Sequence, residues 1–182
     1  QIDCEMSFVS RDQILETFEG LTKHLFKSVL DVDLPDFPRM SYDESVKRYG
    51  SDKPDTRFGM EFVELNEIAK GHGFSVFDNS EFIAGICAKS TASQYSNKDI
   101  KKLTEWLQRP QIGCKGMVYV KYNEDGSIKS SVGKFYTDDQ LKTWLDHAEA
   151  EPGDMLLVLS GETDKTRKQL SELRLEMGRR LE

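Results

Sequence analysis

The chain has 182 residues, of which 31% are charged, 37% hydrophobic and 10% aromatic, and its formal net charge is −7. This length and composition indicate one or two globular domains and exclude a disordered or fibrous chain. No apolar run approaches the roughly 18 residues of a membrane span, and the first residues do not resemble a secretory signal. We therefore expect a cytoplasmic protein with no membrane partner.

A short strand is predicted at residues 2–8, where apolar side chains alternate with Asp3 and Glu5 on the opposite face. A Ser10-x-x-Gln13 capping box then predicts a helix to about Val29. Its apolar residues recur at spacings of three and four, the pattern of a helix that lies on a sheet. A second capping box, at Ser41 and Glu44, predicts a short helix that ends near Gly50.

The polar stretch GSDKPDTR, residues 50–57, contains Gly and Pro and predicts a loop that serves as a domain boundary. Beyond it, the pattern predicts a helix at 63–70, one from a Ser96-x-x-Asp99 capping box to about Leu107, one from a Thr137-x-x-Gln140 capping box through Leu145, and one from about Thr163 to Arg180. Strands are predicted at 74–77, 82–89, 117–122, 127–133 and 155–159, with a hairpin turn at Asn123–Gly126. This irregular alternation favours an α+β fold, an antiparallel sheet with helices on one face.

The charges and cysteines limit the possible ligands. Cys4, Cys87 and Cys114 are odd in number, form no CxxC pair and lie far from the three histidines in sequence, so neither a disulfide framework nor a metal site is expected. The acidic net charge argues against indiscriminate binding of nucleic acid. However, residues 95–135 contain eight Lys or Arg against four Asp or Glu, which gives this segment a net charge of +4.

Three stretches carry a resemblance to one family. QIDCEMSF at 1–8 resembles the second strand of class II motif 2 in aspartyl-tRNA synthetases, and FPRMSYDESVKRYGSDKPDTRFGMEF at 37–62 resembles the segment that follows it in the bacterial form. IGCKGMVYVKY at 112–122, followed by VGKFYTDD and LRLEMGRRL, resembles that form's GAD insertion domain, which also occurs in the B-type subunit of the tRNA-dependent amidotransferase. The resemblance covers essentially the whole chain.

The resemblance implies a domain division and a reaction. Residues 1–57 would be part of a class II catalytic domain, residues 58–180 the GAD insertion domain, and residues 181–182, which depart from the family, a remnant of an expression tag. The parent enzyme would activate aspartate with ATP and Mg²⁺ and transfer it to tRNA. The family's ATP-binding, magnesium-binding and dimer-forming motifs are not matched in this stretch. We therefore expect no catalytic residue, bound cofactor or activity in this chain alone. The parent enzyme would be a homodimer that forms through other regions.

Six residues are candidates for binding. The resemblance implies that Asp3 binds the α-ammonium group of aspartate and that Glu5 supports that region; alternatively, both carboxylates form the solvated face of a strand. Lys115 and Lys134 would contact phosphates of tRNA or a partner, or simply solubilise the surface. Asp52 and Lys53 would lie near the acceptor end of tRNA or order the insertion, or only shape their loop. Trp106 and Trp144 are expected in the core rather than as base-stacking platforms.

Two other functions remain open. The chain could be a non-catalytic RNA- or protein-contact module of the amidotransferase B-subunit type, although QIDCEMSF and YGSDKPD argue against this alternative. An unrelated hydrolase built around Asp3 and Glu5 is a weaker alternative, because no nucleophile or base stands at a recognisable spacing. The sequence does not decide whether the parent charges only aspartate tRNA or asparagine tRNA as well, nor the oligomeric state of this chain.

Overall fold

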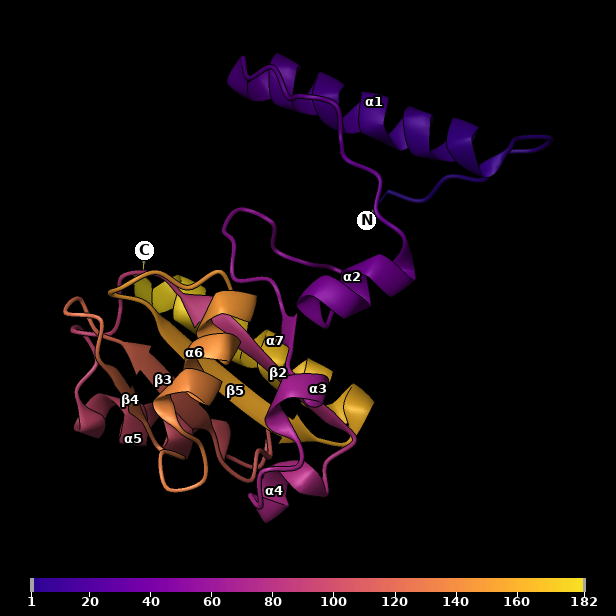
Figure 1. Ribbon diagram of the computed structural model, residues 1–182. Helices are drawn as coiled ribbons and strands as arrows, with labels where there is room; N and C mark the ends of the chain where they lie inside the picture. Colours follow the sequence, from indigo (N-terminus) through magenta and orange to yellow (C-terminus); the bar gives the residue numbers. More distant parts are fainter. Residues whose placement is uncertain (1, 182) are drawn as a thin grey trace. The chain divides into compact units, whose positions relative to one another are not determined.

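The computed structural model describes residues 2–181, and the chain divides between Met40 and Ser41 into two compact units (Figure 1). Each unit is described by itself below. The division between Met40 and Ser41 rests on the density of contacts within the chain. It does not test the family-based boundary between residues 57 and 58, which stays a prediction.

The first unit contains one long helix, α1 (Arg11–Leu30), as predicted. Ser10 accepts a hydrogen bond from the N–H of Gln13 and donates its own N–H to the Gln13 side chain, so the capping box is complete. The predicted strand at residues 2–8 is wrong, because this segment has no regular structure. A strand is stable only when paired, and no other segment of the described residues 2–40 forms one.

The apolar stripe of α1 does not lie on a sheet within its own unit. None of the helix residues is buried, and Val29 is 75% exposed. The periodicity therefore predicted the helix correctly but not its environment in this unit.

The second unit is built on one five-stranded antiparallel sheet in the order β1-β2-β5-β3-β4. The strands are β1 (Val63–Glu64), β2 (Phe82–Ala88), β3 (Val118–Tyr122), β4 (Ile128–Ser130) and β5 (Met155–Gly161). The prediction of the β3–β4 hairpin is confirmed, with Gly126 at φ 81° in its turn. β5, the last strand in sequence, lies at the centre of the sheet between β2 and β3.

Three of the longer helices of this unit begin where capping residues predicted: α2 (Tyr42–Tyr49), α5 (Asn97–Leu107) and α6 (Asp138–His147). The last helix, α7 (Thr163–Leu181), begins where its apolar pattern predicted. Ser96 and Thr137 form complete capping boxes with Asp99 and Gln140. Ser41 caps α2 by accepting from the N–H of Glu44, but the return bond to the Glu44 side chain is absent from this helix, so the capping box predicted there is incomplete.

Two predicted elements between residues 63 and 78 are wrong. The expected helix at 63–70 begins as strand β1, and only α3 (Asn66–Ala69) is helical; the expected strand at 74–77 is the short helix α4 (Ser75–Asp78). The carboxylate of Asp78 accepts hydrogen bonds from the N–H groups of Gly71 (2.8 Å) and Gly73 (3.1 Å). These bonds turn the chain back on itself, which an extended strand at this position would not allow.

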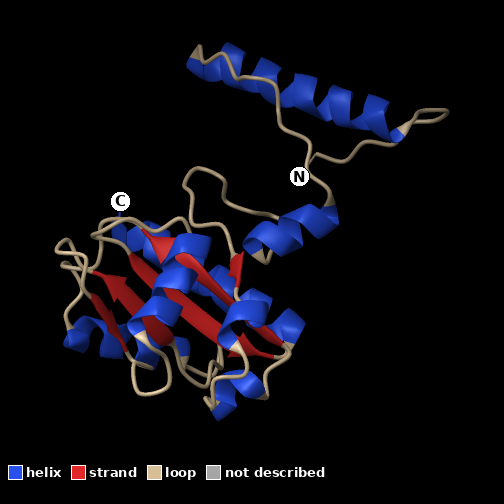
Figure 2. Cartoon of the chain, in the orientation of Figure 1, coloured by secondary structure: helices blue, strands red, loops and turns tan. Residues whose placement is uncertain are grey.

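Helices cover both faces of the sheet, so the expectation of helices on one face is wrong, whereas the α+β class is confirmed. Figure 2 shows α6 in front of the sheet and α7 behind it. All seven residues of β2 are buried. Alternate side chains of β2 and β5 enter opposite cores, one with α3 and α6 and the other with α5 and α7. Nearly continuous apolar runs such as FIAGICA and MLLVL are typical of strands buried on both faces.

Among the described residues, no helix is long and apolar enough to cross a membrane.

Candidate functional site

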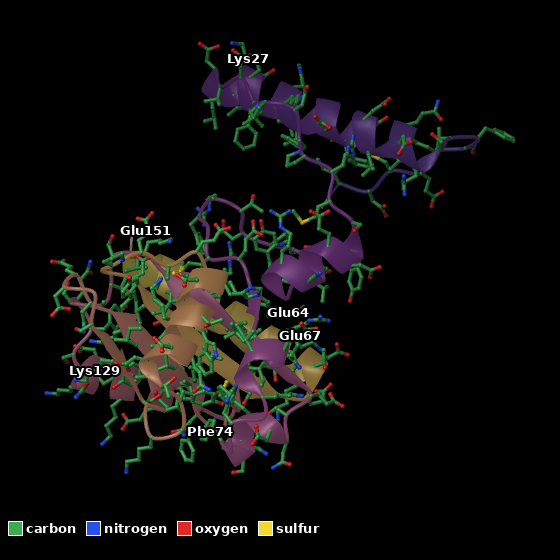
Figure 3. All side chains as sticks on the ribbon, in the orientation of Figure 1. Lys27, Glu64, Glu67, Phe74, Lys129 and Glu151 are labelled. Carbon is green, nitrogen blue, oxygen red and sulfur yellow. The ribbon has the colours of Figure 1, made fainter. Side chains whose placement is uncertain are left out.

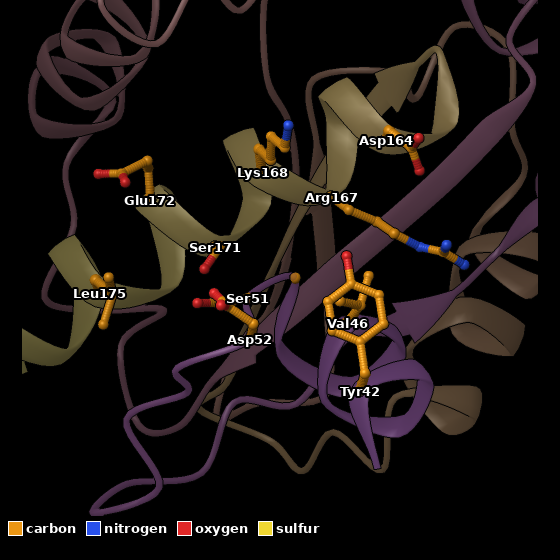
Figure 4. A pocket seen from close by; sticks show the side chains of 11 residues that line it. Tyr42, Val46, Ser51, Asp52, Asp164, Arg167, Lys168, Ser171, Glu172 and Leu175 are labelled. Carbon is orange, nitrogen blue, oxygen red and sulfur yellow. The ribbon is translucent and has the colours of Figure 1, made fainter. Parts of the chain in front are cut away.

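The second unit has a groove between α2, the loop that follows it and α7 (Figure 4). Its volume is about 550 Å³. Its lining is mostly polar and comprises Tyr42, Val46, Gly50, Ser51, Asp52, Asp164, Arg167, Lys168, Ser171, Glu172 and Leu175. The groove is of interest because Asp52, one of the sequence-predicted contact residues, lies in its wall.

The loop beside this groove is held by Arg174 of α7, whose side chain is among the most deeply buried in the chain. Its guanidinium donates hydrogen bonds to the carbonyl oxygens of residues 55, 58, 59 and 60, at 2.8–3.1 Å. It also lies over the rings of Tyr49 (4.7 Å) and Phe58 (4.3 Å). Burial lowers the pKa of Arg174, and the carbonyl dipoles and aromatic faces take the place of water around its charge.

Two glycines allow the loop to approach α7 closely. At Gly50, φ is +71°, and an added Cβ would lie 2.3 Å from the carbonyl oxygen of Arg167. At Gly178, an added Cβ would lie 2.6 Å from the ring of Phe58. Backbone and ring therefore occupy the space that a side chain would need, and the loop is seated directly on the helix.

The ends of the loop are tied to α2. Arg48 donates to Glu61 through Nε (2.9 Å) and Nη2 (2.6 Å), and to Glu44 through Nη1 (2.6 Å). The hydroxyl of Tyr49 also donates to Glu61 (3.1 Å). The hydrogen bonds from Arg48 lower the pKa of Glu61, which keeps this carboxylate ionised and the ion pair formed. The N–H of Phe62 completes the closure by donating to the carbonyl of Arg48 (2.9 Å).

The tip of the loop is exposed. Asp52 lines the groove. The side chain of Lys53 is exposed, and the backbone N–H of Lys53 donates to the hydroxyl of Ser51 (3.1 Å). Across the groove, α7 presents Arg167 and Lys168 (Figure 4). Such a mixture of hydroxyls and charges of both signs suits a polar, charged ligand better than an apolar small molecule.

Arg167 is incompletely satisfied. Its Nη2 lies 3.6 Å from a carboxylate oxygen of Glu64, and its guanidinium lies over the ring of Phe82 at 4.9 Å. Its Nε is buried and has no hydrogen-bond partner among the described residues. The groove wall thus carries a cation with unused donor capacity.

Asp3 and Glu5 belong to the first unit, and both are exposed in a segment without regular structure. Neither carboxylate makes a hydrogen bond or ion pair with another described residue. The other four predicted residues, Asp52, Lys53, Lys115 and Lys134, belong to the second unit, so the two sets are described separately.

Lys115 and Lys134 lie in exposed loops of the second unit, before β3 and after β4 respectively. Lys129 is exposed on β4 at the edge of the sheet (Figure 3). Lys121 of the same basic segment is only 7% exposed and donates to the carbonyl of Tyr95, and burial lowers its pKa. The basic surface is therefore smaller than the charge count of residues 95–135 predicts.

The two tryptophans lie where the sequence predicted. Trp144 is fully buried against the ring of Tyr136, and Trp106 packs at the edge of the core on the α7 side. Among the described residues, no group of three or more His, Cys, Asp or Glu side chains is placed to hold a metal ion.

Sequence reasoning missed the residues that hold the groove together, chiefly Arg174 and Arg167. A signal for Arg174 was present, because it lies four residues after Leu170 and three before Met177, on the buried stripe of α7. An arginine on such a stripe must find acceptors inside the protein. The local pattern gave no indication of which acceptors these are.

Comparisons with known proteins identify the family of the chain. A family model described as tRNA synthetases class II (D, K and N) matches residues 1–170. The chain belongs to this family. Among its relatives, the aspartate–tRNA ligases of Porphyromonas gingivalis and Bacteroides fragilis are each 56% identical to it over 183 residues, and that of Flavobacterium psychrophilum is 54% identical over 181 residues. Each match covers 100% of this chain and 31% of the relative, so the chain spans about a third of the length of these curated relatives.

Proposed function

We propose that the chain is part of an aspartate–tRNA ligase that activates aspartate with ATP and Mg²⁺ and transfers it to tRNA. The observation that carries this proposal is the identity of 54–56% with aspartate–tRNA ligases along the whole chain. The whole enzyme acts in the cytoplasm as a homodimer that forms through regions other than this stretch. The amidotransferase alternative is not favoured, because the relatives that match from end to end are ligases.

In this proposal, residues 1–57 belong to the catalytic domain, residues 58–180 form the GAD insertion domain, and residues 181–182 are a tag remnant. The position of the sheet supports the second assignment, since its first strand begins at Val63. The loop at 50–62 then joins the two domains. Its close seating on α7 is what such a junction needs in order to hold a fixed geometry.

Asp3 binds the α-ammonium group of the substrate aspartate, and Glu5 supports it electrostatically. An ammonium group needs an ionised acceptor, and both carboxylates are exposed with no internal partner among the described residues. Lys115, Lys134 and Lys53 contact phosphates of tRNA, and Asp52 accepts hydrogen bonds from its ribose hydroxyls. The exposure of all four side chains supports these roles.

Asp3→Asn in the whole protein tests the substrate site. A charge-assisted hydrogen bond contributes about 1.5–3 kcal/mol, so the KM for aspartate should rise by roughly 10- to 100-fold while the KM for ATP stays unchanged. The measurement is aspartate-dependent exchange of pyrophosphate into ATP. Asp12→Asn is the matched control, because Asp12 is also exposed in the first unit and pairs only with its neighbour Arg11.

Two outcomes separate the parts of the proposal. If the wild-type whole protein shows no aspartate-dependent exchange, the ligase function is wrong. If the wild type is active and Asp3→Asn behaves like Asp12→Asn, only the role of Asp3 is wrong. The 182-residue chain by itself should show no exchange, because phosphate-charge stabilisation dominates such reactions and the family motifs that supply it are not matched here.

A further inference from the structure

We propose that Arg174 is a positioning residue for RNA binding, which fixes the loop at residues 50–60 on α7 and so holds Asp52 in the groove wall and Lys53 at the exposed tip beside it. This inference rests on the proposed function, because tRNA is the RNA that a ligase of this family would bind. Arg174 itself is buried and does not touch the RNA; it acts through the backbone of the loop.

The contacts of Arg174 are directed at the backbone of one short segment. All five of its hydrogen bonds go to carbonyl oxygens of residues 55–60, and none goes to a carboxylate. A guanidinium presents five N–H donors in a rigid plane, which lets one side chain fix several carbonyls at once. A lysine ammonium cannot reproduce this geometry, because its three donors radiate from a single atom.

Packing alone does not explain an arginine at this position. Its neighbours on the buried stripe of α7, Leu170, Leu173 and Met177, are apolar and fully buried. An apolar residue would continue that stripe without the cost of removing a charge from water. The charge is accounted for by the loop, whose carbonyls would otherwise lack partners where the loop meets the helix.

The loop has a fixed base and an exposed tip. At one end, the N–H of Gly50 donates to the carbonyl of Val46 (3.0 Å), and at the other, the N–H of Phe62 donates to the carbonyl of Arg48 (2.9 Å). Arg174 holds the segment between them. No strand or helix forms between residues 50 and 60, so these contacts and not a backbone ladder set the path of the chain. The tip at residues 52–53 projects from this base, an arrangement that lowers the entropy lost on binding.

The chemistry at the tip suits a phosphate backbone. Lys53 is exposed on the loop, Lys168 is exposed on the opposite wall, and Arg167 also lines the groove. Ammonium and guanidinium groups bind phosphate oxygens, and Ser51 and Asp52 can contact ribose hydroxyls. The choice of RNA as the partner follows from the proposed function. In such a complex the lysines would contact phosphates, and the three carboxylates of the groove lining, Asp52, Asp164 and Glu172, would accept hydrogen bonds from ribose hydroxyls.

The test uses Arg174→Lys in the whole protein, with Arg179→Lys as the matched control. Arg179 is on the same helix but exposed and paired only with Glu176. We expect Arg174→Lys to raise the Kd and KM for tRNA about tenfold, equivalent to about 1.4 kcal/mol, with pyrophosphate exchange within about twofold of wild type. Arg179→Lys should change neither. A purely structural role would lower exchange and tRNA charging together.

A double-mutant cycle tests whether Arg174 acts through the loop. Lys53→Ala should weaken tRNA binding in the wild-type background but have little further effect beside Arg174→Lys, because the displaced tip no longer makes its contact. Equal effects of Lys53→Ala in both backgrounds would overturn the proposal. An unchanged Kd for tRNA in a folded Arg174→Lys protein would overturn it as well.

A second variant covers the case in which Arg174→Lys does not fold. Gly178→Ala places a methyl group where the ring of Phe58 lies, which displaces the same loop without altering Arg174, and alanine is favoured within a helix. It should raise the Kd for tRNA in the same way, and an unchanged Kd would count against the proposal. If the wild-type protein lacks aspartate-dependent exchange, the ligase function fails separately, and the Kd for tRNA still decides the role of Arg174.

Discussion

Replacing Gly50 by alanine should destabilise the second unit by an amount that can be divided into two parts. The first part comes from the left-handed backbone conformation, since φ is +71° and placing an L-residue there costs roughly 1–2 kcal/mol of stability. The second part is steric. The new methyl group would lie 2.3 Å from the carbonyl oxygen of Arg167 and 2.8 Å from the ring of Phe62, and overpacking of this kind costs about 1–3 kcal/mol. The expected total is therefore about 2–5 kcal/mol.

Gly71→Ala is the control that separates the two parts. Gly71 also has a positive φ, +86°, but an added Cβ would meet no heavy atom within 4 Å. The free energy of unfolding of Gly71→Ala should therefore fall only by the backbone part, about 1–2 kcal/mol. The difference between the two variants then measures how closely the end of α2 approaches α7.

Urea unfolding of the 182-residue chain, followed by tryptophan fluorescence, measures both variants. Both tryptophans of the chain, Trp106 and Trp144, lie in the second unit, so the signal reports that unit alone. With an m-value of about 2 kcal/mol/M, Gly50→Ala should lower the midpoint by roughly 1–2.5 M. Equal midpoints for Gly50→Ala and Gly71→Ala would refute the close approach of the loop to α7.

Two further predictions concern the surface and the core of the second unit. Charge reversal of Lys115 and Lys134 in the whole protein should weaken tRNA binding and reduce the slope of log K against log salt by about 1 per lost phosphate contact. Charge reversal of Lys165, which is also exposed, is the control and should leave the slope unchanged. Identical slopes for all these variants in a salt titration would contradict the phosphate contacts. Burial opposes ionisation of Asp154, but bonds from two backbone N–H groups and Lys89 outweigh it and lower its pKa. Its stabilising effect is therefore present above pH ~4 and is lost as the pH falls through the folded pKa. Asp154→Asn should be less stable than wild type at pH 7 by about 1.5–3 kcal/mol, and the difference in urea unfolding should shrink as the pH is lowered below about 4. A difference that stays constant with pH would contradict this sign.

Features specified by neighbouring residues could be predicted from the sequence. The starts of α1, α5 and α6 follow from Ser or Thr with a partner three residues later, and all three capping boxes form as predicted. The hairpin of β3 and β4 follows from the turn sequence at Asn123–Gly126. In each case, the atoms that bond lie within a few residues of one another, so a short window of sequence contains the whole interaction.

Features that depend on distant partners could not be predicted in the same way. Residues 2–8 alternate as a strand does, yet no partner strand forms within residues 2–40, and alternation without pairing does not make a strand. The apolar residues at 74–77 suit either a strand or a helix, and the turn closed by Asp78 decides for the helix. The helices on both faces were predictable in principle from the unbroken apolar runs of β2 and β5.

The candidate site shows the same limit, because the bonds of Arg174 join residues that are 114–119 positions apart. The composition of GSDKPDTR predicts a loop correctly but does not reveal that the carbonyl of Asp55, and those of residues 58–60 just after this stretch, accept hydrogen bonds from a buried guanidinium. This contact gives the two ends of the loop different environments, while the binding role of Asp52 and Lys53 stays a prediction. Residues 55–60 are held by Arg174 and are structural, whereas residues 52 and 53 project from that base with exposed side chains. A binding role at the tip therefore does not compete with a structural role at the base; it depends on it, because a tip without a fixed base would lose its contact to conformational entropy.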